Sequence, residues 1–456
     1  MEVTKTLRVP VHYALTKRKL SILDRVTARH TYCVWLFLKL IEKRDIHVHE
    51  GEYANEVFSK KDLARIRALT NLNAAYAQQC GNQALWMWRS YGGQHEEWEG
   101  QLRHAKGRWR QKLLEREPQR PFRNGLNGKV PVRIDVRTGR LESSKRMKLS
   151  PYVIRLSTLK KRQRIAVPLN PAKYHLDLLR KSRVLDFQLV KRDDRYYAHI
   201  CVKYEVPTHP VRLVRGVDLG VRRAMATVLL KPTRQLGRGD LSVIGDGARK
   251  HRLDLLNGRI AELQRAKKWE PLKRMRHKRR HVAEYYDRLD AIRIAELAMQ
   301  EGSMIAVGYP KGVKYDNYRG NRKRKLRRTL QTRFSYGRRI RYMLEECRER
   351  GIAAEPVLEA WTSVTCHRCG SDDTWRPTQS LFWCLDCGLQ YNADWNAAIN
   401  IGSVFFAHRL GRRATAGLAQ ARDELGHNRA SLEAENEVLT TVHHEVFRPA
   451  SCSANV

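Results

Sequence analysis

Four of the nine cysteines form a regular pattern in the C-terminal part of the sequence. They occur as two Cys-x-x-Cys pairs separated by 14 residues, and they are Cys366, Cys369, Cys384 and Cys387. Such a turn presents two thiolates to one ion, and zinc prefers four ligands in a tetrahedron, at ~2.3 Å for thiolates. The spacing predicts one Zn²⁺. Because four protein ligands leave no open position, this ion would stabilise a fold and would not catalyse a reaction.

Two aspartates stand where candidate elements end or begin. Asp218 follows an apolar run and precedes Gly220, and Asp394 lies in a polar cluster that opens an amphipathic helix. Asp394 alone could be a helix cap. Hydrolysis of a phosphodiester by two divalent cations, however, needs acidic oxygens from separate segments around ions ~3.5–4 Å apart. In a chain that binds nucleic acid, acids at strand ends suggest a two-metal nuclease.

The charge of the chain favours a polyanionic partner. There are 88 Lys+Arg against 47 Asp+Glu, which gives a net charge of +41. A compact fold with this excess repels itself unless a polyanion neutralises it, so nucleic acid is the expected partner. No apolar run reaches the ~18 residues of a membrane span, and the first residues lack a secretory signal. We therefore expect a folded protein of the prokaryotic cytosol or nucleoid that does not bind membranes.

The positive charge is concentrated in two tracts, 265–280 with nine Lys/Arg and 311–341 with thirteen. Each tract has a single acidic residue, whereas a solvated helix face usually alternates in sign. Phosphate binding by such tracts is independent of sequence and sensitive to salt. The predicted nucleic-acid-binding residues are Lys278, Arg279, Arg280, Arg322, Lys323, Arg324, Lys325, Arg327 and Arg328.

The elements that must position these residues fall into two blocks. Residues 3–10 alternate like a strand, and helical spacing follows over the next ~100 residues. Short alternating runs between 130 and 206 favour a small β-barrel, which the first strand could complete, with the helical block inserted. After residue 214 strands alternate with helices, which is typical of an α/β layer. One long helical stretch, about 250–300, is expected to break at Pro271.

Four separated signatures share an order and spacing with a known family. They are G-V-D-L-G at 216–220, T-S-V-T-C-x-x-C-G at 362–370, C-x-x-C-G at 384–388 and N-A-D-x-N-A-A-x-N-I at 392–401. Together they resemble the RuvC-type nuclease half of the transposon-encoded TnpB proteins and the compact type V CRISPR effectors. This resemblance covers about residues 211–403. The N-terminal half resembles the family in architecture only.

The resemblance implies a multidomain α+β protein with a helical recognition lobe inserted into a wedge-type β-barrel. An RNase H-like (RuvC) α/β domain with a zinc-ribbon insertion would follow. The implied bounds are 1–16 and 126–210 for the wedge barrel, 17–125 for the recognition lobe, 211–363 and 389–410 for the nuclease domain, 364–388 for the zinc ribbon and 411–456 for a C-terminal tail.

The resemblance also implies an activity, RNA-guided DNA endonuclease. A bound guide RNA would pair with target double-stranded DNA beside a short flanking motif, and one RuvC-like site would cut with two Mg²⁺ ions. Asp218 and Asp394 match the first and third catalytic aspartates of the family. One chain could act on a guide RNA as a monomer, or two chains as an asymmetric dimer. The guide could come from a transposon end or from a CRISPR array.

The middle acid of the family is missing at its usual place. The central strand of the family ends in a Glu, whereas this chain has Gly308 there. The following strand, 352–360, carries Glu355 and Glu359, which alternation places on one face. We expect Glu359 to supply the third metal ligand, with Glu355 as the other candidate.

Two alternatives remain open. The chain could be a nuclease-dead, RNA-guided DNA-binding protein that blocks transcription, because Gly308 replaces the usual Glu. It could also be a transposition accessory that binds RNA or DNA without specificity.

Overall fold

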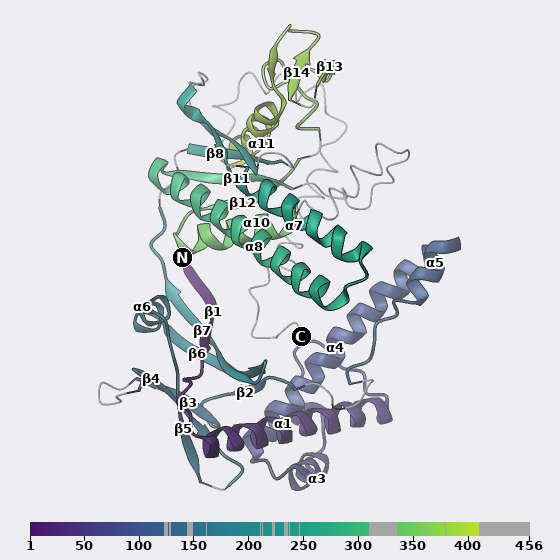
Figure 1. The fold of residues 1–456 in the computed structure, drawn as a ribbon, viewed down its shortest axis with the longest axis vertical. Coiled ribbons are helices and arrows are strands. Elements are labelled where there is room, and N and C mark those ends of the chain that lie inside the picture. Colours follow the sequence, from purple (N-terminus) through teal and green to yellow (C-terminus); the bar gives the residue numbers. More distant parts are fainter. Residues whose placement is uncertain are drawn as a thin grey trace. The chain divides into compact units, whose positions relative to one another are not determined.

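The computed structural model describes residues 1–409 except 123–125, 127–128, 144–148, 161, 210, 212, 221–223, 232–235, 237, 246, 310–334, 360 and 379. The chain divides near residue 205 into two compact units, each with its own sheets and helices (Figure 1). None of the helices among these residues is both long enough and apolar enough to cross a membrane.

The N-terminal unit contains the predicted helical block. Its helices are α1 (Lys17–Arg44), α2 (Ala54–Val57), α3 (Lys60–Thr70), α4 (Ala74–His104), α5 (Gly107–Leu114) and α6 (Lys173–Lys181). The Thr16 side chain caps α1 by accepting from the backbone N–H of Lys19, and Asp45 ends the helix in the left-handed conformation. Helix α1 packs along α4. The short helix α6 was not predicted.

The strands of this unit form two open sheets. One has the order β1-β7-β6-β2 and the other β3-β4-β5, and an isolated bridge pairs Val11 with Leu169. The predicted first strand does pair with the later ones across the helical insertion, but the described residues contain no closed barrel, so the barrel is not confirmed. The bounds are β1 (Glu2–Pro10), β2 (Val132–Ile134), β3 (Gly139–Ser143), β4 (Tyr152–Ser157), β5 (Arg164–Pro168), β6 (Arg183–Arg192) and β7 (Arg195–Glu205).

The C-terminal unit is built on a five-stranded sheet of order β10-β9-β8-β11-β12. Its strands are β8 (Leu213–Leu219), β9 (Met225–Leu230), β10 (Leu241–Ile244), β11 (Ser303–Tyr309) and β12 (Ala354–Leu358). The first three pair antiparallel, whereas β11 is parallel to both β8 and β12. β12 therefore lies beside β11, as predicted for the strand after the next helix.

Helices cover both faces of this sheet. On one face, α8 (Trp269–Glu301) and α10 (Tyr336–Glu349) pack against Val217, Ile305 and Val307. On the other face, α11 (Ala393–Arg409) packs against Val214, Met304 and Ala306. Because side chains alternate along a strand, Asp218 and Gly308 belong to the α11 face. The sheet thus presents the predicted acids to the helix that carries Asp394.

The break in the long helical stretch lies three residues earlier than predicted. Helix α7 (Ala248–Arg265) ends before Lys267, which adopts φ 52°, and α8 begins at Trp269. Pro271 is in the first turn of α8, where its missing N–H costs no hydrogen bond.

The cysteine module is a small sheet of its own. Strands β13 (Thr374–Trp375), β14 (Leu381–Cys384) and β15 (Gln390–Asn392) pair antiparallel in that order, and β15 runs directly into α11.

Candidate active site and metal centre

Asp218 is the sixth residue of the seven-residue strand β8, in the middle of the sheet. Its side chain is half-buried, and the residues before it are fully buried. A strand enclosed on both faces reads as a continuous apolar run, which is why this carboxylate is conspicuous in the sequence.

Asp394 lies in the first turn of α11. The Asn392 side chain caps this end of the helix by accepting from the N–H groups of Asp394 at 3.0 Å and Trp395 at 3.3 Å. Helix α11 approaches β8 closely at Gly216, because a Cβ there would lie 2.9 Å from the backbone nitrogen of Gly402. The two glycines therefore let main chain pack on main chain.

Glu359 follows β12 directly, and its carboxylate occupies the space above Gly308 on the neighbouring strand. A Cβ built on Gly308 would lie 2.5 Å from Oε2 of Glu359 and 2.7 Å from Cδ1 of Ile401. Glu355 shares this face, but it lies four residues earlier, about 13 Å back along the strand. Of the two candidate glutamates, the structure brings Glu359 to the position that Gly308 leaves open.

The charges of Glu359 and Asp394 act on Asp218. The pKa of Asp218 is raised to about 8, first by burial and then by the negative charges of Glu359 and Asp394, while Arg376 of the cysteine module opposes the rise. Burial raises the pKa of Glu359 to about 7. Buried like charges of this kind favour either protons or divalent cations. The site therefore has the chemistry of a cation-binding acid cluster.

The ligand atoms of the three carboxylates are farther apart than those of the four cysteines. Among the described residues, one group of three or more candidate metal ligands has all its ligand atoms within 4.8 Å of one another. This group is the four cysteines. The carboxylates are not gathered so tightly.

The cysteine module fits a tetrahedral ion. The Sγ atoms of Cys366 and Cys387 are 3.7 Å apart, and those of Cys369 and Cys384 are 3.5 Å apart. Thiolates at ~2.3 Å from one tetrahedral ion would be separated by ~3.8 Å. Gly370 and Gly388 follow the second cysteine of each pair with φ of 80° and 68°. The donor set and its geometry match the predicted zinc.

Two buried asparagines of α11 tie the acids to this module. The Asn400 side chain donates to the backbone carbonyls of Thr362 at 2.8 Å and Thr365 at 2.7 Å. Asn396 donates to the Thr365 carbonyl at 2.9 Å, and its oxygen accepts from the backbone N–H of His367 at 3.1 Å. The turn after Glu359 is thus held by the helix that carries Asp394. The sequence analysis missed this role, although two asparagines four residues apart on one helix face were a signal for it.

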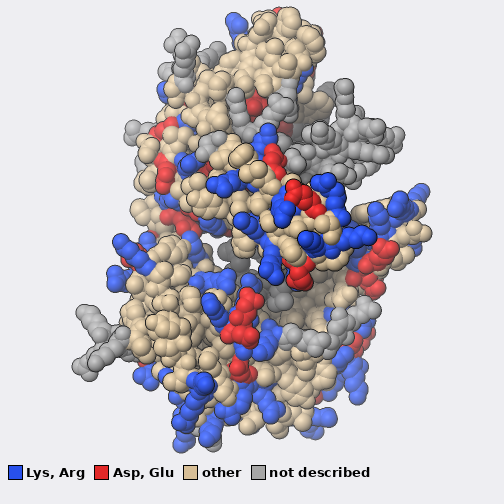
Figure 2. Space-filling view, in the orientation of Figure 1, with Lys and Arg blue, Asp and Glu red and all other residues tan. Residues whose placement is uncertain are grey.

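The predicted nucleic-acid-binding residues differ in exposure and in hydrogen bonding. Lys278 and Arg280 are exposed on α8, where Arg280 donates to Glu284, and half-buried Arg279 donates to Asn257. Lys and Arg side chains spread over the face of the molecule drawn in Figure 2. The remaining predicted residues, Arg322, Lys323, Arg324, Lys325, Arg327 and Arg328, lie outside the described residues.

Two cations of the second tract have a structural role. Arg338 pairs with fully buried Asp287 at 2.6 Å, and Arg339 pairs with the same carboxylate at 3.3 Å. They are therefore engaged within the fold, between α8 and α10.

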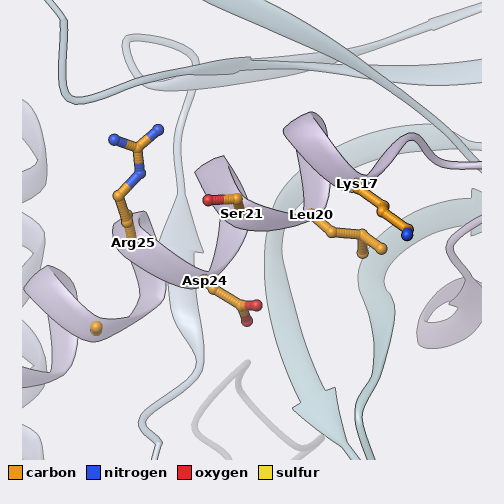
Figure 3. A pocket seen from close by; sticks show the side chains of 6 residues that line it. Lys17, Leu20, Ser21, Asp24 and Arg25 are labelled. Carbon is orange, nitrogen blue, oxygen red and sulfur yellow. The ribbon is translucent and has the colours of Figure 1, made fainter.

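An open pocket of about 480 Å³ lies in the N-terminal unit. It is lined by α1 residues, among them Lys17, Asp24 and Arg25 (Figure 3). Asp24 accepts from Lys191 and from the Tyr196 hydroxyl, both at 2.6 Å. None of the predicted acids lines this pocket.

Part of the chain is similar to known CRISPR-associated proteins. Residues 336–401 match the family model "Cas12f1-like, TNB domain". The CRISPR-associated endodeoxyribonuclease Cas12f1 of Sulfoacidibacillus thermotolerans is 26% identical over 294 residues, which are 57% of this chain. The match spans 65% of that protein, just under two thirds of its length.

Solved structures of similar proteins include a complex of Cas12f1 with single-guide RNA and target DNA. Its TM-score is 0.47 at 12% identity, with 88% of this chain and 99% of that one covered. The mini-RNA-guided endonuclease CRISPR-Cas phi3 has a TM-score of 0.44 at 10% identity, with 88% of this chain and 92% of that one covered.

The chain is a multidomain α+β protein that has acids at one sheet edge and an attached four-cysteine module. The matched domain and the curated relative show that this chain is similar to Cas12f1 proteins, in agreement with the resemblance that its signatures predicted.

Proposed function

We propose that this chain is an RNA-guided, Mg²⁺-dependent DNA endonuclease with one RuvC-like site. The observation that carries the proposal is that the charges of Glu359 and Asp394 raise the pKa of Asp218, while the Glu359 carboxylate lies beside Gly308 on the adjacent strand. The curated relative is named an endodeoxyribonuclease, which supports the same activity here. A net charge of +41 supports a nucleic-acid substrate.

Asp218, Glu359 and Asp394 would hold two Mg²⁺ ions. Such a pair supplies an activated water and stabilises the charge on the attacking and leaving oxygens. The contribution of the protein is to keep three repelling carboxylates together in a partly buried place, where cations relieve the repulsion. Arg376, whose charge already acts on Asp218, adds a cation suited to a phosphate.

Guide RNA and target double-stranded DNA are the proposed partners. The exposed cations of α8 and the second basic tract would bind phosphates, while base pairing with the guide reads the sequence. The wedge and recognition lobe (1–16, 17–125 and 126–210) would hold the guide and the flanking motif. The nuclease domain and zinc ribbon (211–410) would cut. Monomer and asymmetric dimer are both compatible with this arrangement, and the cytosol or nucleoid is the proposed location.

The second candidate function is guided DNA binding without cleavage. Gly308 favours it, because the family carries its middle acid at this position. The position of the Glu359 carboxylate directly beside Gly308 favours cleavage over this alternative.

The test begins with the protein purified from its native host. RNA that co-purifies is sequenced, and DNA that matches it is offered with Mg²⁺ to the wild type and to Asp218→Asn, Asp394→Asn and Glu359→Gln. Glu355→Gln is the matched control, since it removes a charge from the same strand and face. We expect cleavage by the wild type and by the control, and guided binding without cleavage by the other three.

The alternatives predict different results. Wild-type protein that binds matching DNA and leaves it intact would establish the guided binder. RNA of no defined length would favour the non-specific accessory. Full cleavage by Glu359→Gln would remove Glu359 from the proposed ligand set.

A further inference from the structure

Trp361 combines an exposed aromatic side chain with a strained backbone conformation. Its side chain is 71% exposed. Its backbone has φ 66°, the left-handed region that bulky residues rarely adopt. Strained residues of this kind cluster at sites that bind or react.

The conformation of Trp361 is held by a defined set of hydrogen bonds. Its carbonyl accepts from the N–H groups of Val364 and Thr365, both at 2.9 Å. The next residue, Thr362, donates its N–H and its hydroxyl to the Glu359 carbonyl at 3.2 and 2.9 Å. Buried Asn400 then fixes the turn from α11. These hydrogen bonds fix the backbone of a turn whose large aromatic side chain is exposed to solvent.

Trp361 lies close to the acid site along the backbone. Trp361 is two residues after Glu359, so their Cα atoms are at most about 7 Å apart. The Glu359 carboxylate lies against Gly308, and its charge acts on Asp218. Arg376 brings a positive charge to the same place. An aromatic face beside hydrolytic acids and a cation suits an unpaired base whose neighbouring phosphate enters the site.

We propose that Trp361 binds the DNA strand that is to be cut, by stacking on an unpaired base next to the acids. This inference deepens the proposed function and rests on it for the identity of the strand. Stacking on an aromatic ring tolerates any base, so Trp361 would position the strand without reading its sequence. Core packing does not account for a side chain that is mostly exposed.

The direct test is photocrosslinking to single-stranded DNA that carries 5-iodouracil. The tryptic peptide 351–368 contains Trp361 as its single Trp, Tyr or Phe, so a crosslink there that Trp361→Ala loses is assigned to this ring. We expect DNA attached to this peptide in the full-length wild type and in Trp361→Phe, and none in Trp361→Ala. Crosslinks in the wild type that leave this peptide untouched would overturn the proposal.

A second measurement concerns cleavage of the same DNA. We expect Trp361→Ala to raise KM about 10- to 100-fold with a smaller change in kcat, and Trp361→Phe to restore most of the loss. Trp269→Ala, which removes a side chain 67% exposed at the start of α8, is the matched control and should leave KM unchanged. Equal effects of Trp361→Ala and Trp269→Ala would contradict a specific role.

Two further checks separate this inference from misfolding and from the proposed function. Trp361→Gly removes the ring and also relieves the left-handed backbone, so it should fold and still lose the crosslink. A wild type that crosslinks through Trp361 but does not cut would refute the nuclease and retain the stacking site. A wild type that cuts without this crosslink would refute the stacking site alone.

Discussion

Gly308 is on β11, and Glu359 directly follows the adjacent parallel strand β12. Both face the same space. The Gly308 Cα leaves room that the Glu359 carboxylate fills from the next strand, while Ile401 of α11 closes the other side. A carboxylate from either strand would reach the same place, because both belong to the face that packs on α11. Glu359 could therefore take the place of the missing acid from the neighbouring strand.

This leads to a prediction for a two-residue exchange. Glu359→Ala should lower cleavage about 10²-fold or more, as removal of one preorganised charged group does. Adding Gly308→Glu to that variant should restore a large part of the rate, since the Cβ at 308 points to the vacated space. Gly308→Glu alone should be destabilising, because it meets the Glu359 carboxylate. Cleavage rates and unfolding midpoints of the three variants test this; a double variant no faster than Glu359→Ala would contradict it.

The raised pKa values of Asp218 and Glu359 predict a pH dependence. Both carboxyls bind protons more tightly in the folded than in the unfolded chain, with folded pKa values of about 8 and about 7. Between about pH 4 and pH 8 the folded state thus holds more protons, and without added Mg²⁺ its stability should fall as pH rises. Mg²⁺ affinity should rise over the same window, because the ion needs the charged forms.

Thermal unfolding at several pH values, with and without Mg²⁺, measures both effects. Asp218→Asn should flatten the pH dependence and unfold at a higher temperature than the wild type near pH 8. The wild type and Asp218→Asn could instead both become more stable as pH rises, and by the same amount. That result would contradict the raised pKa values.

Hydrogen bonds join the four-cysteine module to α11. His367, inside the first Cys-x-x-Cys turn, donates its backbone N–H to Asn396, which also holds Thr365. The turn that follows Glu359 therefore depends on the ribbon as well as on the sheet.

Loss of the ribbon should consequently reduce cleavage while the acids remain in place. The wild type should contain one zinc per chain by elemental analysis, and Cys384→Ser should lose it. We expect the cleavage rate of Cys384→Ser to fall about 10- to 100-fold, as for loss of residues that orient a metal site. Cys452→Ser, a cysteine outside the ribbon, is the control. A zinc-free variant that cuts at the wild-type rate would show that the ribbon does not position the turn.

Some elements could be predicted from the sequence and others could not, for a physical reason. Residues 366–387 determine the cysteine site locally, so spacing alone was sufficient. The helix break shifted from Pro271 because proline is compatible with a first turn. The short elements β3 and α6 were missed, and so were the Asp287 pairs with Arg338 and Arg339, whose partners lie 51 and 52 residues apart in the sequence. Glu359 was identified only because the resemblance supplied the order of the strands.

At the scale of the whole molecule the net charge of +41 dominates binding. Affinity for RNA should fall steeply with salt, about 10³- to 10⁵-fold between ~50 and ~200 mM for ~6–10 phosphate contacts. Lys278→Gln should lower the slope of log K against log salt by about 1, whereas Arg279→Gln should lower it less because Arg279 is engaged with Asn257. Glu284→Gln, which frees Arg280, should not lower it. Filter binding across a salt series measures the slopes, and equal slopes for all variants would exclude α8 from the RNA-binding surface.

Gly216 and Gly402 have a mechanical consequence. A strand and a helix that touch through their backbones have no compressible layer of side chains between them. Any displacement of α11 should therefore move β8 with it, so that Asp218 and Asp394 keep their relative positions. The spacing of these two acids should be insensitive to strain elsewhere, whereas Glu359 is coupled to α11 through the side-chain hydrogen bonds that Asn400 donates to the following turn.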